Sequence, residues 1–298
     1  MQGGMAALPV ALTRLCQRAG VRFRYQSVCR RILVRGGRVA GVDLGEGEQI
    51  PADEVIFNGD AAALRQGLLG PEAVSALPKR RPMRSLSAVT WSMRGRTQGV
   101  QLDRHNIFFG NRYASEFEDI FERGRLPAEP TVYVCAQDRG VSDPIADRER
   151  LFCLINAPAI GDGAPFSAME LDRSRDRCFD FLRACGLSLE SESERIVCTS
   201  PHQFHLRYPG TGGALYGQAT HGWMSIFSRP GSTTRLPGLY LAGGSVHPGP
   251  GVPMAALSGR LAAEALMANR GSTSSSRRVA ISGGMSMQPA MTGHTDSP

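Results

Sequence analysis

The chain of 298 residues is long enough for one large domain or two modest ones, and its 42% hydrophobic and 20% charged residues are ordinary for a globular protein. Its formal net charge of +7 suits an anionic cofactor, an acidic membrane surface or nucleic acid. The basic residues are scattered, without an aromatic-interleaved stripe or a nucleic-acid module, so the sequence argues against nucleic acid as a partner.

Cysteine usage and hydropathy argue against several further classes. The seven cysteines are an odd number and include no C-x-x-C pair, which predicts reduced, mostly buried thiols in a cytosolic setting rather than a disulfide framework or a zinc site. We expect no metal site at His202 and His205 either, because this pair has no acidic neighbour. The sequence shows neither a basic segment before its first apolar run nor about 18 consecutive apolar residues, so we expect no signal peptide and no spanning helix.

The first 60 residues predict one helix followed by strands. Leu8, Leu12 and Leu15 recur at helical spacing, and Gly20 is placed to end the helix that they indicate. The sequence Arg35-Gly-Gly37 favours a hairpin turn, because glycine adopts positive φ without strain. Strands are expected at residues 21–25, 27–34, 38–44 and 53–58.

Residues 84–200 alternate short apolar runs with polar loops, which indicates an antiparallel sheet with one long helix. Asp60, which follows Asn58-Gly59, is predicted to be a turn or N-cap residue, with a role in a site as the alternative. Ser200 and Pro201 predict the start of a helical turn. Helices are expected at residues 61–69 and 169–185, and strands at 85–94, 106–109, 131–136, 151–157 and 195–199.

The most informative segment is Leu236–Gly259, which predicts a buried strand, a glycine-rich crossing and a helix opened by Pro253. Glycines without a Cβ let a backbone approach a ligand closely. Free N–H groups and the helix dipole point at such a ligand from the helix N-terminus, so the segment favours an anion. The glycines of the crossing are Gly243, Gly244, Gly249 and Gly251.

Two familiar motifs are not matched in this segment. Gly249-x-Gly251-x-x-Met254 resembles a dinucleotide fingerprint only superficially, because the third small residue is missing and the glycines trail the strand. Gly243-Gly-Ser245 is not a hydrolase elbow, because position 247 is histidine. His247 is a candidate for proton transfer, with capping or packing as the alternative.

A glycine-dense stretch at residues 208–227 carries a large aromatic load, including Tyr216, Trp223 and Phe227. Such a load suits either packing beneath the last strand or the lining of a pocket for a flat, apolar ligand. The sequence leaves both interpretations open.

The segment Leu239-Tyr-Leu-Ala-Gly-Gly-Ser-Val-His-Pro-Gly-Pro-Gly-Val-Pro-Met-Ala-Ala-Leu-Ser-Gly-Arg260 resembles the C-terminal FAD-contacting segment of bacterial phytoene-desaturase-type carotenoid desaturases. Residues 3–8, 41–60 and 212–222 agree with the same family. The resemblance covers about residues 3–268 and is strongest to the hydroxyneurosporene (methoxyneurosporene) 3,4-desaturase branch.

This resemblance implies an α/β (α+β) fold, in which a discontinuous FAD domain joins an antiparallel-sheet substrate domain. FAD-domain segments are expected at 1–60 and 201–270, the substrate domain at 61–200, and a disordered tail at 271–298. Val28 is expected beside the adenine of FAD. The other expected cofactor contacts are Gly243, Gly244, Gly251, Val252, Pro253 and Met254.

The implied reaction belongs to carotenoid biosynthesis and removes two hydrogens from C-3 and C-4 of a 1-hydroxy- or 1-methoxy-carotenoid, with the electrons passing through FAD to oxygen or a quinone. The apolar substrate is expected beside Tyr216, Trp223 and Phe227, with His247 as the candidate catalytic residue. The implied location is cytoplasmic, peripheral to the inner membrane.

Members of this family open with a strand, a G-x-G-x-x-G turn and a helix, and no such opening occurs in the 298 residues. We therefore expect a C-terminal portion of such an enzyme that is inactive alone. The alternatives are a fragment of a phytoene desaturase or flavin amine oxidase, and a non-catalytic remnant that binds carotenoid or a membrane surface.

Overall fold

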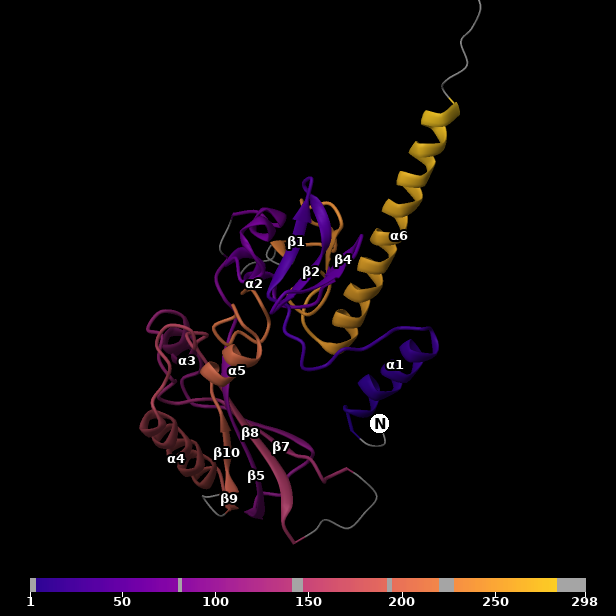
Figure 1. Ribbon diagram of the computed structural model, residues 1–298. Coiled ribbons are helices and arrows are strands. Elements are labelled where there is room, and N and C mark those ends of the chain that lie inside the picture. The colour runs from indigo at the N-terminus through magenta and orange to yellow at the C-terminus, as the bar shows by residue number, and fades with distance from the viewer. Residues whose placement is uncertain (1–3, 80–81, 141–146, 192–194, 220–227, 283–298) are drawn as a thin grey trace, which may run out of the picture.

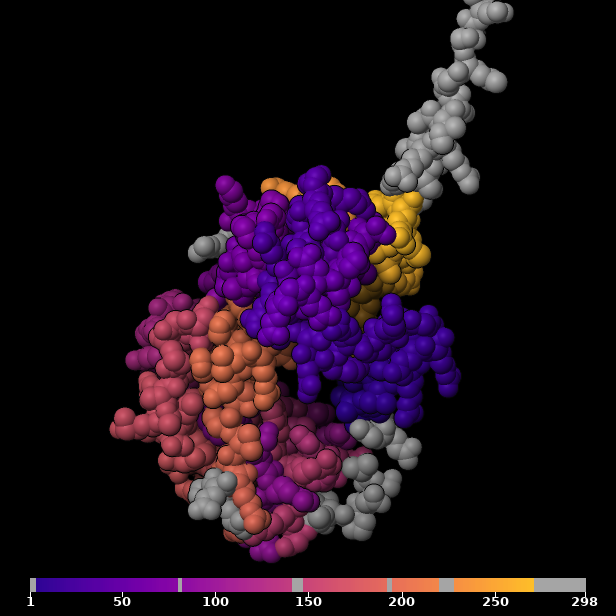
Figure 2. Space-filling model, in the orientation of Figure 1, coloured from indigo at the N-terminus to yellow at the C-terminus, as the bar shows by residue number. Residues whose placement is uncertain are grey.

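The computed structural model describes residues 4–79, 82–140, 147–191, 195–219 and 228–282, with side chains up to residue 270. Two lobes are visible in Figure 1, one around strands β1, β2 and β4, the other around β5, β7 and β8. The chain passes from the first lobe to the second after η1 (Pro71–Ala76) and returns through α5, and both lobes are also seen in the space-filling view of Figure 2. Mixed helices and antiparallel strands agree with the predicted α/β (α+β) class.

The first lobe holds an antiparallel three-stranded sheet and a parallel pair. In the first sheet the order is β1-β2-β3, and in the pair β11 lies beside β4. Gly36 and Gly37 have φ values of 57° and 72°, so the predicted hairpin turn is confirmed. The elements of this lobe are β1 (Arg31–Arg35), β2 (Arg38–Gly45), β3 (Glu48–Pro51), β4 (Val55–Phe57), α2 (Ala61–Arg65), η1 (Pro71–Ala76) and β11 (Leu239–Leu241).

The core of this lobe joins segments from both ends of the sequence. Ile32 of β1 and Leu64 of α2 pack with Leu239 and Leu241 of β11, and all four are fully buried. Burial of apolar side chains removes their surface from water, which is the main favourable term in folding. Strand β11 is therefore fixed against residues that precede it by about 200 positions.

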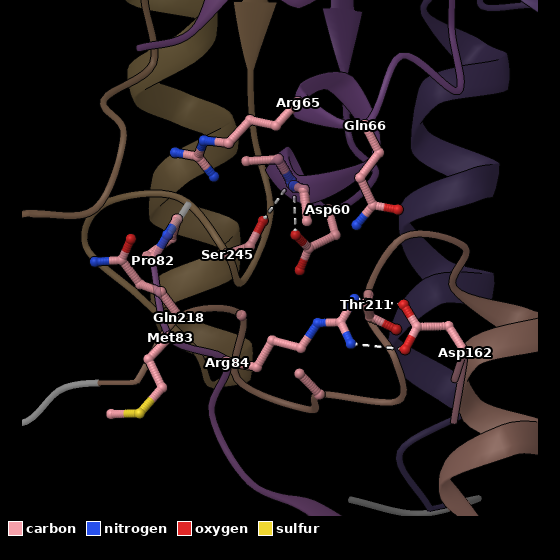
Figure 3. A pocket seen from close by; sticks show the side chains of 14 residues that line it. Asp60, Arg65, Gln66, Pro82, Met83, Arg84, Asp162, Thr211, Gln218 and Ser245 are labelled. Atoms are coloured by element: carbon pink, nitrogen blue, oxygen red, sulfur yellow. Dashed lines mark hydrogen bonds and ion pairs between the residues drawn. The ribbon is translucent and has the colours of Figure 1, made fainter. Parts of the chain in front are cut away.

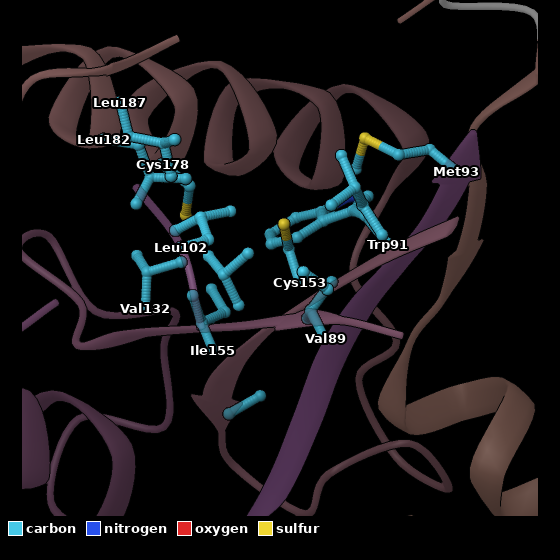
Figure 4. Packing of buried hydrophobic residues seen from close by; sticks show 14 of the residues in the cluster. Val89, Trp91, Met93, Leu102, Val132, Cys153, Ile155, Cys178, Leu182 and Leu187 are labelled. Carbon is cyan, nitrogen blue, oxygen red and sulfur yellow. The ribbon is translucent and has the colours of Figure 1, made fainter. Parts of the chain in front are cut away.

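The second lobe is a six-stranded sheet covered on one face by α4. The strand order is β10-β5-β8-β7-β6, with β9 paired to β5, and every pairing is antiparallel. Figure 4 shows Trp91 and Cys153 of the sheet packed against Cys178 and Leu182 of the helix. The elements are β5 (Ser87–Gly99), β6 (His105–Phe108), α3 (Tyr113–Phe121), β7 (Val132–Ala136), β8 (Glu149–Ala157), α4 (Ala168–Ala184), β9 (Leu187–Glu190), β10 (Val197–Thr199) and α5 (Pro201–Arg207).

Two helices flank the first lobe. Helix α1 (Ala7–Arg18) ends just before Gly20, as predicted, and has no buried residue. Helix α6 (Val252–Ser282) packs Ala262 against Tyr240 and Ala242 and then projects beyond the lobe (Figure 1). Within the described part of the chain, no helix combines the length and the apolarity that crossing a bilayer requires.

Several predicted boundaries differ from the structure. Residues 21–25 form no strand, and β1 begins at Arg31 instead of residue 27. Residues 21–28 are exposed, and none of their backbone groups is hydrogen-bonded to a strand of the described structure. Elements β3, α3, η1 and β9 were not predicted.

The structure also differs from the prediction in the C-terminal residues. Helix α6 continues through residues 271–282, where we expected a disordered tail, while 283–298 lie outside the described residues. Adding a residue to an existing helix costs far less than starting one, so a packed first half can extend into a serine-rich sequence.

Candidate functional site

A cavity of about 420 Å³ lies where the two lobes meet, and both lobes line it. Its lining side chains include Asp60, Arg65 and Gln66 from the region of α2, and Arg84 from the segment that leads into β5. Ser245 of the glycine crossing completes one side (Figure 3). The volume falls within the range of small-molecule pockets.

Asp60 is the N-cap of α2, as predicted, because one carboxylate oxygen accepts a hydrogen bond from the backbone N–H of Ala62 at 2.8 Å. Burial raises the pKa of this carboxyl group, against the opposing effects of the Ala62 hydrogen bond and of the charges on Arg65, Arg229 and Arg84. The carboxylate points into the cavity in Figure 3, and Asp60 forms no ion pair with another described residue.

Arg65 supplies a positive charge to the same cavity. Burial lowers the pKa of its guanidinium, and Asp60 is the charge that opposes this shift. The Nε atom is buried and has no hydrogen-bond partner. A buried donor without a partner is costly, so the burial of this Nε–H is unfavourable in the structure as it stands.

Arg84, in contrast, is fully engaged. It donates hydrogen bonds to both carboxylate oxygens of Asp162, at 2.7 and 2.5 Å, and one to the carbonyl of Ala159 at 3.1 Å. The Arg84 guanidinium lowers the pKa of Asp162. This bidentate pair joins the entry to β5 with the loop after β8, and it closes the base of the cavity (Figure 3).

The glycine crossing is held against the end of β4 by hydrogen bonds. Ala242 N–H donates to the carbonyl of Phe57 at 3.1 Å, and Ser245 Oγ accepts from Ala61 N–H at 3.2 Å. A Cβ on Gly243 would lie 2.8 Å from Oδ1 of Asn58, so only glycine fits there without displacement. The crossing and Asn58-Gly59-Asp60 therefore form one continuous wall.

Arg229 links this wall to residues 216–218 through hydrogen bonds. Its guanidinium is buried and donates to the carbonyls of Tyr216 at 2.9 Å, Gln218 at 3.2 Å and Gly244 at 3.4 Å. Burial lowers the pKa of Arg229, although Asp60 opposes the shift. Arg229 thus supplies donors to three carbonyl groups that accept from no other donor in the described part of the chain.

The first turn of α6 is exposed to solvent. Val252 and Met254 are 50% and 42% exposed, and a Cβ on Gly251 would meet no atom within 4 Å. A Cβ on Gly244 would come only within 3.6 Å of Pro250, an ordinary contact. The protein thus leaves free space at the two glycines where we expect a flavin, and the residues present fit such a group.

The remaining predicted site residues are less closely assembled. Val28 is 61% exposed in an irregular stretch, and His247 has an exposed side chain that does not line the cavity. Tyr216 is 48% exposed, and its backbone N–H donates to Ser85 Oγ. Trp223 and Phe227 lie outside the described residues. Pro253, at the first turn of α6, is exposed like its neighbours.

Sequence reasoning missed the arginines of the cavity. Arg65 carries no motif signal, and Arg84 resembles any surface arginine until Asp162, 78 residues later, is placed beside it. The high density of glycine at residues 208–217 was visible in the sequence, and the structure explains it. A Cβ on Gly212 would lie 2.1 Å from Nη1 of Arg84, and one on Gly213 would lie 2.3 Å from the carbonyl oxygen of Pro201.

Comparison with known proteins gives the family. Residues 1–267 match the model of the flavin containing amine oxidoreductases. The chain belongs to this family. Family membership agrees with the space left open at Gly251 and with the carotenoid-desaturase resemblance of the sequence.

Three relatives among the curated proteins are informative. The chain is 56% identical to a hydroxyneurosporene desaturase of Rubrivivax gelatinosus over 98% of its own length and 56% of that protein. A hydroxyneurosporene desaturase of Cereibacter sphaeroides is 43% identical over 92% of the chain and 55% of its own length. A 1-hydroxycarotenoid 3,4-desaturase of a Flavobacterium species is 31% identical over 88% and 54%. The chain thus spans about half the length of the curated relatives it matches.

All seven cysteines are free, but only Cys153 and Cys178 are buried, so the prediction of mostly buried thiols is wrong; Cys185 is exposed and the other four are half-buried. Among the residues that the structure describes, no three His, Cys, Asp or Glu side chains are grouped to hold a metal ion.

Proposed function

We propose that this chain contributes to an FAD-dependent carotenoid desaturase that introduces a 3,4 double bond into a 1-hydroxy- or 1-methoxy-carotenoid. The observation that carries the proposal is the 56% identity to a hydroxyneurosporene desaturase over nearly the whole chain. The open space beside Gly244 and Gly251 supports FAD as the flavin. The cavity at Asp60 supports a substrate site at the meeting of the two lobes.

The chain's own residues would contribute binding and orientation. Backbone groups at Gly251, Val252, Pro253 and Met254 would hold the flavin, with Gly243 and Gly244 allowing close approach, and Val28 is proposed to contact the adenine. When bound, the flavin supplies hydride acceptance. The bidentate Arg84–Asp162 pair fixes the floor of the substrate cavity, which keeps the reacting bond in place.

His247 remains our candidate for proton transfer, and Tyr216, Trp223 and Phe227 our candidates for apolar substrate contacts. We further propose that the protein works at the membrane surface from the cytoplasmic side, because its carotenoid substrate is apolar and its net charge is positive. Reoxidation by oxygen or a quinone is part of the same proposal.

A region exchange tests the proposed function. The segment of the Rubrivivax gelatinosus desaturase that matches this chain is replaced by this chain, and the product is supplied with FAD and a 1-hydroxylated carotenoid. We expect flavin absorbance in the purified protein and a red shift of the carotenoid spectrum as the polyene lengthens. A colourless product that ignores added FAD would contradict the proposal, and so would bound flavin without any desaturation of carotenoid. The chain by itself, assayed in parallel, tests the expectation that it is inactive alone.

A further inference from the structure

Arg229 is a buried cation whose partners are carbonyl groups rather than carboxylates. It is 6% exposed, and it forms no ion pair with a described residue. Burying a charge without a counter-ion is costly unless hydrogen bonds replace those that water supplied. Every hydrogen bond that the structure gives this guanidinium goes to a backbone carbonyl, so its side chain holds backbone in place.

The three carbonyls belong to two segments that are separate in the sequence. Nη1 of Arg229 donates to the carbonyls of Tyr216 at 2.9 Å and Gly244 at 3.4 Å, and Nη2 donates to that of Gln218 at 3.2 Å. Gln218 lines the cavity, whereas Gly244 belongs to the glycine crossing. A planar guanidinium suits this arrangement because its donors diverge in a fixed geometry, which the ammonium group of lysine does not reproduce. One side chain therefore connects the cavity wall with the crossing.

Glycines provide the space around this guanidinium. A Cβ on Gly217 would lie 3.4 Å from Nη1 of Arg229, and a Cβ on Gly249 would lie 3.5 Å from its Nε. The two glycines have φ values of +69° and +133°, which other residues rarely adopt. Arg229 therefore fits between two stretches of backbone that carry no side chain towards it.

The residues that follow Arg229 are bonded to the same part of the chain. His247 N–H donates to the carbonyl of Pro230 at 2.9 Å, and Leu241 N–H donates to that of Ser232 at 2.8 Å. These two bonds join backbone to backbone, so they do not depend on which side chain stands at position 229. The contact with Gly244, in contrast, exists only because residue 229 is an arginine.

We expect the flavin at the glycine crossing, and a backbone contact to a cofactor is only as accurate as the position of that backbone. We propose that Arg229 is a positioning residue, which fixes the glycine crossing for the flavin through the carbonyl of Gly244 and does not itself touch the cofactor. This inference rests on the proposed function, because the flavin at the crossing comes from there. Without the guanidinium, three carbonyl groups lose their donors and the crossing loses its fixed position.

Hydrogen exchange of the 298-residue chain, followed by mass spectrometry, tests the positioning without the cofactor. Arg229→Met removes every donor and keeps the apolar stem, while Arg229→Lys keeps the charge. We expect Arg229→Met to accelerate exchange of the amides of residues 243–249 at least about tenfold more than that of β5 and β8, with a smaller effect for Arg229→Lys. The matched control is Arg235→Met, because Arg235 is exposed on the same segment, and it should keep wild-type rates.

Flavin fluorescence titration of the region-exchanged enzyme tests the consequence for the cofactor. We expect Arg229→Met to weaken FAD binding about 10- to 100-fold, as is typical of residues that hold a direct ligand contact in place, and Arg229→Lys to weaken it less. Because Gly244→Ala acts at the same peptide, the double variant should lose less than the product of the two separate losses. Leu182→Ala, in the core of the second lobe, controls for lowered stability and should keep FAD affinity within about twofold.

The outcomes separate this inference from the proposed function. Unchanged FAD affinity in Arg229→Met would overturn the inference and leave the proposed function standing, because the wild-type enzyme would still bind the flavin. Equal acceleration of exchange at the crossing and in β5 and β8, an equal loss of FAD affinity in Leu182→Ala, or fully independent losses in the double variant would also overturn it. A wild-type region-exchanged enzyme that takes up no FAD would contradict the proposed function, and this inference with it.

Discussion

Gly217 lies against Ser245 so closely that a Cβ on Gly217 would be 2.9 Å from the Cβ of Ser245. The φ of Gly217 is +69°, a conformation that other residues adopt only with strain. Because of both features, the backbone at Gly217 lies directly against the glycine crossing. The next residue, Gln218, lines the cavity. The lobe junction thus depends on this glycine twice, for its backbone angle and for its missing side chain.

We predict that Gly217→Ala lowers the free energy of unfolding by about 1–3 kcal/mol, because the left-handed backbone becomes strained and Ser245 must move. Urea denaturation followed by circular dichroism measures this loss. The matched control is Gly231→Ala, where an added Cβ meets no atom within 4 Å, and its change should stay within about 0.5 kcal/mol. Equal stability of the two variants would show that the close contact is unimportant.

A substitution at Gly244 tests whether a ligand lies close to this backbone, because the added side chain would not strain the protein itself. An added Cβ there makes only an ordinary 3.6 Å contact with Pro250. Gly244→Ala should therefore leave the free energy of unfolding within about 0.5 kcal/mol of wild type. In the region-exchanged enzyme we expect at least a tenfold loss of FAD affinity, measured by flavin fluorescence titration. Unchanged FAD affinity would mean that the flavin does not approach Gly244.

The Arg84–Asp162 pair predicts a specific pH dependence. Because Arg84 lowers the pKa of Asp162 in the folded state, the pair stabilises the fold above the unfolded carboxyl value, about 3.9. This contribution is lost as pH falls through the depressed folded value. We expect Asp162→Asn to be less stable than wild type at pH 7 by about 1 kcal/mol, and the difference to narrow towards pH 3. Urea midpoints at pH 7, 5, 4 and 3 provide the measurement, and a difference that is constant with pH would contradict it.

Buried cysteines should resist modification. Burial raises the pKa of the Cys153 thiol to about 12, and burial also raises that of Cys178. Because the thiolate is the nucleophile, we expect Cys185, which is exposed, to react with iodoacetamide at pH 8 at least 100-fold faster than these two. Peptide mass spectrometry over time distinguishes the sites. Reaction in urea serves as the control, where all seven cysteines should label alike.

Local signals of the sequence predicted much of the second lobe. The alternation along β7 and β8 and the apolar face of α4 matched the structure to within one or two residues, since these patterns follow directly from the faces that each element buries. The capping box of Ser167 and Glu170 starts α4 one residue before the predicted first turn. Helix α3 was missed because its buried residues include Glu116 and Asp119, which carry no apolar signal.

The site was predicted only in part. The glycine crossing, with Gly243 and Gly244, was singled out from the sequence because a missing Cβ is itself a signal, and its contact with a cofactor stays a prediction. Arg65 and Asp162 could not be identified, since their meaning depends on partners far away in sequence and on a cavity between lobes. The strand predicted at residues 21–25 is absent. The residue types of a short segment do not reveal whether a neighbouring strand is available to pair with it.

Helix α1 has a consequence for local stability. None of its twelve residues is buried, and an isolated helix of that length is marginal in water. Its amide hydrogens should therefore exchange with solvent through local opening that costs little free energy, while those of β5 and β8 exchange only through global unfolding. Any molecule that covers α1 would slow exchange there first, so the protection of this one helix is a sensitive and site-specific reporter of association.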